Sequence, residues 1–263
     1  MADEAMALCD DYAKDFDPDY YIQIFEDPEP SPILANLMSF ILTNYHKAFN
    51  SGTVKGKTLL DIGTGPTIYS VISAAQHCDN IFLSDFCQSN NDILKQWRDG
   101  SLEFSFDKIF EMVLKIEGKS KTDIPERAAS IRDKICGILH CDIRDDNPFS
   151  PNFLPQVDIV TSSFCLEAVA TDLASYERYA RNMVGMLKPG GHVVICGCLG
   201  GTFYTVGEKK FGTLGMSRDE LKSTWKKVGI QIISWDEGVR AKEDYSDVEG
   251  SYSMVGKKVP VAL

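Results

Sequence analysis

Residues 59–70 read LLDIGTGPTIYS, and this stretch decides the fold. Its apolar start predicts a short buried strand over residues 58–61, and its end predicts a helix over residues 67–75. Gly63 and Gly65 lie between them. Glycine has no Cβ, so the backbone can approach a polar ligand closely, and N–H groups near a helix start can hold an anionic group. We therefore expect a ligand at this turn, although a tight strand–helix turn without a ligand would use the same glycines.

Carboxylates follow the next two predicted strands. Asp85 ends the strand over residues 81–84, about 20 residues after the glycines, where an acidic side chain can accept both ribose hydroxyls of an adenosine. Asp142 ends the strand over residues 137–141, and we expect it to accept the adenine amino group while the backbone of Ile143 contacts the ring edge. Each aspartate could also be a plain turn or cap residue. Together with the glycines, they predict an adenosine-containing ligand.

The glycine pattern departs from the dinucleotide fingerprint G-x-G-x-x-G. Ile68 occupies the position of the third glycine, and Pro66 also lies in the loop. The third glycine of that fingerprint allows the helix and strand to pack closely. The departure counts against an NAD site.

Strands and helices alternate along the rest of the chain, which predicts an α/β fold with a mostly parallel, doubly wound sheet covered on both faces. Residues 102–118 fit both the helical and the strand periodicity, so we leave them unassigned. The other predicted elements are helices over residues 126–135, 172–187 and 217–229, and strands over residues 157–162, 192–197, 230–235 and 251–256. The sequence KPGG at residues 188–191 is expected to end the second of these helices.

Two N-terminal helices are expected to begin with a cap residue followed by proline. Asp17 and Ser31 are the predicted caps, because a side-chain oxygen there can accept a free N–H of the first turn, and proline at the next position has no N–H to satisfy. Ser89 is expected to cap the helix that follows Asp85.

The composition is that of one soluble globular domain. The chain has 263 residues, 44% hydrophobic and 25% charged, with a formal net charge of −11. That charge makes nucleic acid and anionic membranes poor partners and favours a small cationic ligand. The N-terminus is acidic, without the basic region of a signal peptide, and no window approaches the roughly 18 apolar residues of a membrane span. We expect a cytoplasmic protein that acts as a monomer.

The eight cysteines include no CxxC pair, which favours reduced, buried thiols over a disulfide framework. His140, Cys141 and Asp142 have side chains that can bind a metal. Adjacent strand residues point to opposite faces, however, so we expect no metal site there.

Several motifs together resemble the small-molecule amine and pyridine N-methyltransferase family, which includes the phenylethanolamine, nicotinamide and indolethylamine N-methyltransferases. They are LLDIGTGPTIYS, SSFCLEAV, DLASYERYARNMVGMLKPGGHVVICG and YTVGEKKF, and the resemblance runs from FDPDYY to VEGSYSMVGKK, nearly the whole chain. It implies a class I, Rossmann-like S-adenosylmethionine (SAM) methyltransferase fold: a seven-stranded mostly parallel sheet with an antiparallel last strand. It also implies a single domain, with an N-terminal helical cover over residues 1–52 and a catalytic core over residues 53–263.

The resemblance implies SAM as cofactor and S-adenosylhomocysteine as product, and it assigns the cofactor contacts. Tyr20 matches a family tyrosine that closes over cofactor and substrate, while Phe25 stands where the family has a second cover tyrosine, so one hydroxyl contact is missing. The other implied contacts are Gly63, Thr64 and Tyr69 at the methionine end, Asp85 and Asn90 at the ribose, Asp142 and Ile143 at the adenine, and Ser163 with Phe164 where donor meets acceptor. Gly65, in the glycine turn, is also expected to bind the cofactor.

The acceptor site needs a carboxylate if the substrate is an amine, because an ammonium nitrogen has no lone pair until its proton is removed. Glu167 matches the glutamate that binds the substrate amine in the phenylethanolamine enzyme. Its simpler interpretation is a charge at a helix N-terminus. Cys165, nearby, is expected to be a packing residue.

Other acceptor positions depart from the relatives. Gly197 stands where the nicotinamide enzyme has an aspartate, and Gly200-Gly201 where the phenylethanolamine enzyme has two acids. Ser246 and Asp247 match positions near the acceptor, and Asp247 could replace one lost acid. Tyr204 and Phe203 match an aromatic wall, although aromatic residues there can equally belong to the core.

We therefore predict a SAM-dependent N-methyltransferase that acts on a small phenylethanolamine-like or arylalkylamine-like amine, with Glu167, Tyr20 and Asp247 as its catalytic residues. Methylation of nicotinamide or another pyridine is the alternative within the class. Outside it, the alternatives are an NAD-dependent oxidoreductase and a SAM-binding scaffold without activity.

Overall fold

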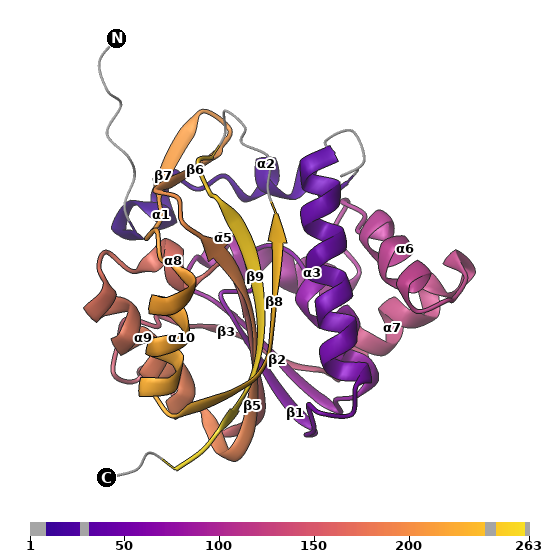
Figure 1. Cartoon of the computed structure of the whole chain (residues 1–263). Helices are drawn as coiled ribbons and strands as arrows, with labels where there is room; N and C mark the ends of the chain where they lie inside the picture. Colours follow the sequence, from indigo (N-terminus) through magenta and orange to yellow (C-terminus); the bar gives the residue numbers. More distant parts are fainter. Residues whose placement is uncertain (1–8, 27–31, 240–245, 261–263) are drawn as a thin grey trace.

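The computed structural model describes residues 9–26, 32–239 and 246–260 (Figure 1). Its strands are β1 (Thr58–Ile62), β2 (Asn80–Asp85), β3 (Ile135–His140), β4 (Val157–Ser163), β5 (Leu187–Leu199), β6 (Phe203–Val206), β7 (Lys209–Gly212), β8 (Ile230–Val239) and β9 (Gly250–Lys258). Its α-helices are α1 (Cys9–Asp15), α2 (Pro18–Gln23), α3 (Pro32–Asn50), α4 (Tyr69–Ile72), α5 (Gln88–Asp99), α6 (Asp107–Ile116), α7 (Ile124–Lys134), α8 (Leu166–Val169), α9 (Leu173–Gly185) and α10 (Arg218–Lys227).

One sheet of seven strands organises the molecule, in the order β3-β2-β1-β4-β5-β9-β8. β1 pairs in parallel with β2 and β4, and the parallel pairing continues to β3 and β5. β9, the last strand, lies antiparallel between β5 and β8. The predicted fold is therefore confirmed, including the reversed last strand.

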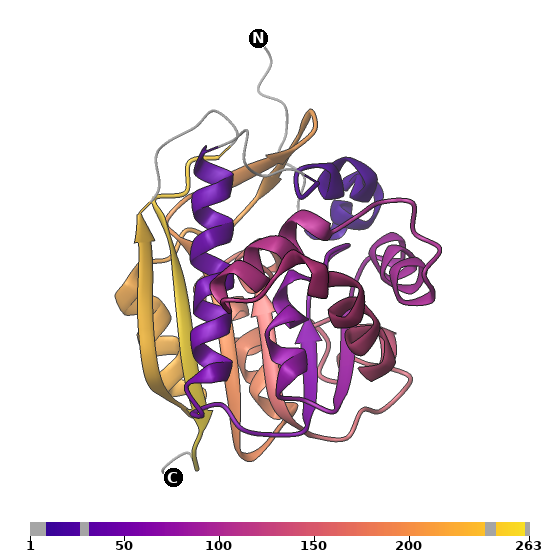
Figure 2. The same ribbon diagram turned by 90° about the vertical axis from the view of Figure 1, so that its right-hand side faces the viewer.

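Helices cover both faces of the sheet (Figures 1 and 2). Leu59 packs in the core beneath α3, α4, α6 and α7, whereas the next residue, Leu60, packs in the core beneath α9 and α10. Successive strand residues point to opposite faces, so one apolar run supplies both cores. Because the strand residues are almost all apolar, helices cover both faces of the sheet, as predicted.

The N-terminal helices take two different places. α3 packs on the sheet itself, against β5, β8 and β9. α1 and α2 lie beyond the carboxyl ends of the strands, beside the β6–β7 hairpin, at the top of Figure 1. Asp17 caps α2 as predicted, accepting the N–H of Tyr20 at 2.9 Å, while the predicted cap Ser31 lies outside the described residues.

Several local predictions differ from the structure. Residues 67–75 form only the short helix α4 and a 3-10 turn, and the unassigned residues 102–118 contain α6. α5 begins one residue before Ser89, so the prediction of a Ser89 cap is wrong. The KPGG segment lies inside β5, where the pairing register with β4 shifts, because Gly190 at φ +77° lets the strand bulge. The β6–β7 hairpin and α1 were not predicted.

Among the described residues, no helix is both long enough and apolar enough to span a bilayer.

Candidate active site

The glycine turn lies at the carboxyl end of β1, between the sheet and α4. Gly63 and Gly65 both have φ +66°, a left-handed conformation that favours glycine. A Cβ on Gly63 would lie 2.4 Å from the Sγ of Cys165, whereas a Cβ on Gly65 would have no atom within 4 Å. Gly63 therefore allows the close approach of the β4–α8 loop, which gives Cys165 a packing role, and Gly65 faces open space.

Hydrogen bonds hold the turn against β2. The Thr64 hydroxyl donates to the carbonyl of Asp61 at 3.2 Å and accepts the N–H of Ser84 at 3.1 Å. Asp61, for which the sequence motifs give no signal, accepts from Thr161 at 2.5 Å and Ser70 at 2.8 Å. Burial raises the pKa of the Asp61 carboxyl to about 6. The buried Asp61 therefore holds the glycine turn in place through its hydrogen bonds.

Asp85 lies next to the glycine turn, at the end of β2. Its carboxylate accepts the N–H of Gly65 at 2.8 Å, the N–H of Cys87 at 2.9 Å and the side-chain amide of Asn90 at 2.9 Å. Burial raises its pKa, while these three donors lower it. A carboxylate offers about four acceptor positions, so capacity remains for a ligand hydroxyl.

Asn90 supplies a test of whether an adenosine fits here. Its side chain is fully buried, and its Oδ1 has no hydrogen-bond partner among the described residues. An unpaired buried acceptor is costly and calls for a donor. A ribose hydroxyl is such a donor. Gly65, which donates to the same Asp85 carboxylate as Asn90, faces open space, so the residues fit the ligand predicted from the sequence.

At the predicted adenine end, Asp142 already has a partner. Its carboxylate pairs with the guanidinium of Arg144 at 2.7 and 2.8 Å, which with the Arg144 N–H holds the Asp142 pKa low against the effect of burial. The guanidinium also lies 4.8 Å from the ring centre of Phe86. The carbonyl of Ile143 accepts from Asn182 at 3.0 Å. An adenine amino group would have to share Asp142 with Arg144, a pairing that was not predicted from the sequence.

The aromatic cover differs from the prediction in its key tyrosine. Tyr20 is 47% exposed, and its ring lies 3.9 Å from where a Cβ on Gly207 would be. Tyr21 instead lies toward the strand ends, where burial and the charge of Asp85 raise its pKa to about 12. Successive residues of a helix point in different directions. A shift of one position along α2 therefore changes which tyrosine faces the site.

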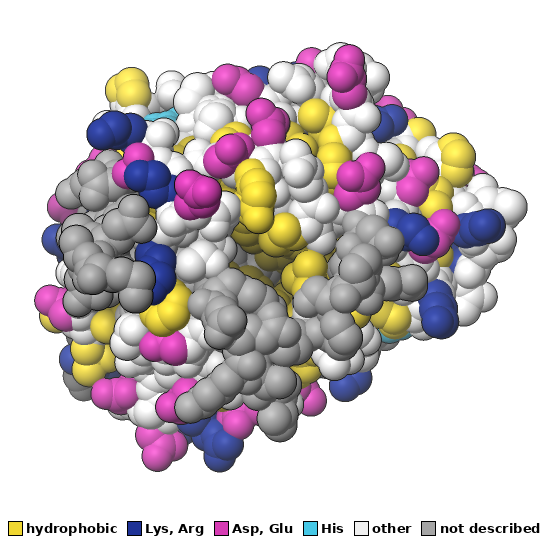
Figure 3. Space-filling model, turned by 90° about the horizontal axis from the view of Figure 1, so that it is seen from above, with side chains coloured by type: hydrophobic (Ala, Val, Ile, Leu, Met, Phe, Trp, Pro, Cys, Tyr) yellow, Lys and Arg dark blue, Asp and Glu magenta, His cyan; other side chains and the backbone are white. Residues whose placement is uncertain are grey.

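Further aromatic side chains complete this cover. Phe25 stacks on Tyr69 with ring centres 5.8 Å apart. The pKa of Tyr12, in α1, is raised by burial and by its neighbour Tyr204 of β6. Figure 3 looks onto this end of the molecule, where hydrophobic side chains gather in a hollow with acidic side chains around it. Sequence patterns on α1 gave no signal for Tyr12, because only the fold brings it near Tyr204.

The predicted point of methyl transfer lies at the end of β4. The Ser163 hydroxyl hydrogen-bonds to that of Tyr45 at 2.8 Å. Phe164 has φ +53°, although it is not glycine, and its N–H donates to the carbonyl of Cys196 at 2.9 Å. A bulky residue in this conformation is strained, and such strain is concentrated at functional sites.

Glu167, at the start of α8, is 2% exposed. Its Oε1 accepts the hydroxyl of Tyr252 at 2.9 Å, and burial raises its pKa to about 7. A Cβ on Gly197 would lie 2.1 Å from this oxygen and 2.6 Å from the Tyr252 ring. The space left by the missing side chain at position 197 is therefore filled by Glu167 and Tyr252.

Asp247 and Glu249, in the predicted acceptor segment, contact the loop between β5 and β6. Asp247 accepts the N–H groups of Thr202 and Phe203 at 2.7 and 3.1 Å and the Thr202 hydroxyl at 2.8 Å, which lowers its pKa against the effect of burial. Ser246 is buried and pairs as a bridge with Tyr204. The exposed side chain of Glu249 fills the space over Gly200, with Oε2 2.9 Å from where a Cβ would be.

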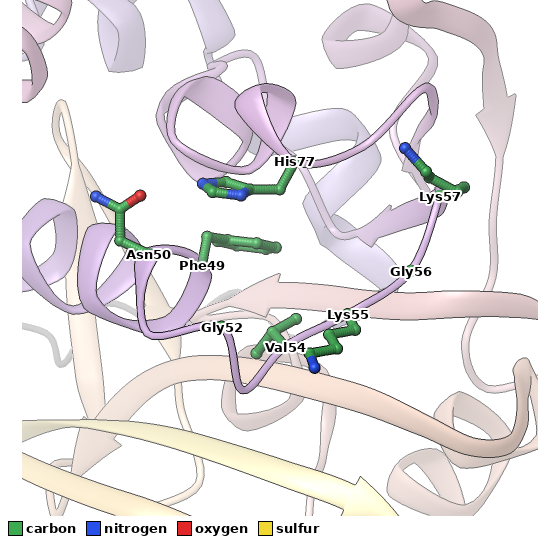
Figure 4. A pocket seen from close by; sticks show the side chains of 8 residues that line it. All are labelled: Phe49, Asn50, Gly52, Val54, Lys55, Gly56, Lys57 and His77. Carbon is green, nitrogen blue, oxygen red and sulfur yellow. The ribbon is translucent and has the colours of Figure 1, made fainter.

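A shallow cavity of about 320 Å³ lies elsewhere, near the amino end of β1 (Figure 4). Phe49 and His77 stack across it, and Lys57, on its wall, pairs with Asp79 at 3.0 Å. It shares no residue with the predicted site. Among the described residues, no group of three or more His, Cys, Asp or Glu side chains is arranged to hold a metal.

The sequence profile of the NNMT/PNMT/TEMT family matches residues 4–259 of this chain. Nicotinamide N-methyltransferase of Homo sapiens is 32% identical over 95% of this chain and 96% of its own length. Indolethylamine N-methyltransferase of Oryctolagus cuniculus is 33% identical over 85% of each. Phenylethanolamine N-methyltransferase of Macaca mulatta is 33% identical over 71% of this chain and 67% of its own length.

Among solved structures, the magnesium protoporphyrin IX methyltransferase of Synechocystis with bound SAM superposes with a TM-score of 0.60. The comparison covers 97% of this chain and 100% of that one, at 10% sequence identity. At this identity the likeness shows a shared fold.

Proposed function

Because the chain belongs to the NNMT/PNMT/TEMT family, we propose that it transfers a methyl group from SAM to the nitrogen of a small amine of the arylalkylamine class. By family and fold it is a SAM-dependent N-methyltransferase, so an NAD-dependent oxidoreductase is no longer an alternative. The relatives named for nicotinamide, indolethylamine and phenylethanolamine leave the acceptor open between an amine and a pyridine.

Glu167 is the observation that carries the choice of an amine. Its carboxyl is buried and belongs to no ion pair of the described residues, and its one side-chain partner is the neutral hydroxyl of Tyr252. A buried carboxylate without a cation is costly, and an ammonium group would offset that cost. A neutral pyridine would leave Glu167 without a counter-ion.

The chain's residues would share the work of the reaction. Bound SAM supplies an electrophilic methyl group on a sulfonium, and Gly63, Gly65, Asp85 and Asn90 are the residues we propose to hold it. Tyr21 takes in this proposal the covering role predicted for Tyr20. The aromatic cover excludes water and limits the orientations of the acceptor, which is most of what an in-line displacement needs from a protein.

Glu167 is proposed to remove the proton that blocks the acceptor. It takes one proton from the ammonium and becomes a neutral acid, and the amine gains the lone pair that forms the new bond to carbon. A pKa near 7 suits this exchange, because the group is then neither fully protonated nor weakly basic at neutral pH. Asp247, committed to the loop N–H groups, is proposed to shape the pocket and not to take protons.

The test is a methyl-transfer screen with phenylethylamine, tryptamine, histamine and nicotinamide, made with the natural chain and with Glu167→Gln. Glutamine keeps the size and an acceptor for Tyr252 but cannot take the proton. We expect an amine to be methylated, and the substitution to lower its kcat/KM at least about tenfold while changing nicotinamide methylation less than about twofold.

Two results would contradict the proposal. Transfer to nicotinamide alone, unaffected by Glu167→Gln, would identify a pyridine methyltransferase. Binding of SAM without transfer to any acceptor would support the scaffold alternative.

The oligomeric state and the compartment remain predictions, to be checked by analytical ultracentrifugation and by fractionation.

A further inference from the structure

The side chain of Glu167 is held by a stack and a hydrogen-bond chain that the reaction itself does not require. Tyr252, in β9, lies directly opposite Gly197 of β5 in the sheet register. Its ring is fully buried and stacks on Trp235 of β8, with ring centres 4.7 Å apart and planes 5° from parallel. Because Gly197 has no side chain, the Tyr252 hydroxyl reaches across β5 to Glu167.

The direction of these hydrogen bonds follows from the number of protons. The Tyr252 hydroxyl has one proton, and it donates that proton to Oε1 of Glu167 at 2.9 Å. The hydroxyl of Tyr176, in α9, lies 3.3 Å from that of Tyr252, so Tyr176 must be the donor in this second contact. A hydroxyl that accepts a hydrogen bond becomes a better donor.

The chain of hydroxyls holds the carboxylate and offers no exit for a proton. Tyr176 and Tyr252 are both 0% exposed, and the pKa of each is raised by burial, so both stay protonated. The proton taken by Glu167 must leave on the acceptor side.

The other titratable groups around Glu167 carry no positive charge. They are Cys165 from the β4–α8 loop and Cys196 from β5, whose pKa values burial raises, so both are neutral near pH 7. The remaining donors are the backbone groups of Glu167 itself and of Cys198, which lower the pKa of Glu167 together with Tyr252. Tyr252 is therefore the nearest side chain that can stabilise the charged carboxylate.

We propose that Tyr252 is a positioning residue for Glu167: stacked on Trp235 and backed by Tyr176, its hydroxyl fixes one carboxylate oxygen and sets the pH range in which Glu167 can take the ammonium proton. This proposal rests on the proposed function. It adds that a residue of the neighbouring strand β9, which does not touch the substrate, sets the protonation range of Glu167 across Gly197.

The experiment uses Tyr252→Phe, which keeps the ring, its burial and its stack on Trp235 and removes only the hydroxyl. A hydrogen bond to a charged group is lost, so the acidic midpoint of the kcat/KM profile for the amine should move upward by about one pH unit or more. The rate should recover when the pH is raised. In the Glu167→Gln background, Tyr252→Phe should change kcat/KM less than about twofold.

An infrared titration of the Glu167 carboxyl makes the test independent of activity. The C=O band of the protonated acid is assigned by its absence in Glu167→Gln, and its midpoint should rise by the same amount in Tyr252→Phe. A protein that methylates no amine but shows this shift would contradict the proposed function and leave Tyr252 in its role. An unchanged midpoint in both measurements would overturn the role of Tyr252.

Tyr176→Phe is the second variant, and it serves if Tyr252→Phe does not fold. It removes the donor behind Tyr252 and should raise the same midpoint by a smaller amount, roughly a few tenths of a pH unit. No shift in a folded Tyr176→Phe, or a shift to lower pH, would overturn the chain of hydroxyls.

Discussion

Gly63 and Gly65 have the same backbone φ of +66°, yet their surroundings give them different importance. At Gly63 a methyl group would meet the Cys165 side chain at 2.4 Å, and at Gly65 it would meet nothing within 4 Å. The sequence alone does not show which of the two glycines matters more for stability. Only the packing of the β4–α8 loop against the turn separates them.

We expect Gly63→Ala to lower the free energy of unfolding by at least about 2 kcal/mol more than Gly65→Ala does, because both incur the strain of a positive φ but only Gly63 is also crowded. Urea denaturation of the two variants measures the difference. Equal losses for the two variants would show that the loop yields to the extra methyl group.

At the scale of the element, capping chemistry decides which predicted helix starts are correct. Asp172 precedes α9 and forms a capping box with Ser175, accepting its N–H at 2.7 Å. Ser89 has the residue type of a cap, but it lies in the first turn of α5 and is exposed. The difference comes from Asp85, whose contacts with Cys87 and Asn90 fix the start of α5 two residues earlier than a Ser89 cap would place it.

Asp172→Ala should therefore cost about 1 kcal/mol of stability, the usual loss for a capping side chain. Ser89→Ala is the matched control and should change stability by less than about 0.5 kcal/mol. Thermal unfolding followed by circular dichroism resolves the two. A loss at Ser89 as large as that at Asp172 would mean that the α5 start is assigned wrongly.

At the scale of the whole molecule, the site is assembled from distant parts of the chain. β1, β2 and β4 bring Gly63, Asp85 and Phe164 to one end of the sheet, and α1, α2 and the β6–β7 hairpin lie beyond it (Figure 1). Such a site exists only in the folded state. A ligand that binds there stabilises the fold in proportion to the logarithm of its concentration.

SAM and S-adenosylhomocysteine should raise the unfolding temperature of the chain, with about 2.7 kcal/mol of stabilisation at a ligand concentration 100 times Kd. NADH at the same concentration should leave the unfolding temperature unchanged. Differential scanning calorimetry makes the comparison, and stabilisation by NADH but not by SAM would contradict the cofactor assignment.

The sequence by itself determined the seven strands of the main sheet, most of the helices between them, the glycine turn and the acids at the strand ends. These signals are local: an apolar run, a residue without Cβ, and a carboxylate at a fixed distance along the chain are visible without the fold. The motif resemblance added the cofactor and the reaction class, and the family match bears both out.

Tertiary structure decided which side chain faces the site and what it touches. Tyr21 lies toward Asp85 in place of Tyr20, and the guanidinium of Arg144 pairs with the Asp142 carboxylate. The hydroxyl of Tyr252 reaches Glu167 across Gly197. The physical reason is that side-chain direction and pairing depend on helix start, strand register and the space left by residues far away in sequence. The Glu167 and Tyr252 positions, for example, are separated by 85 residues and meet only because β9 returns beside β5.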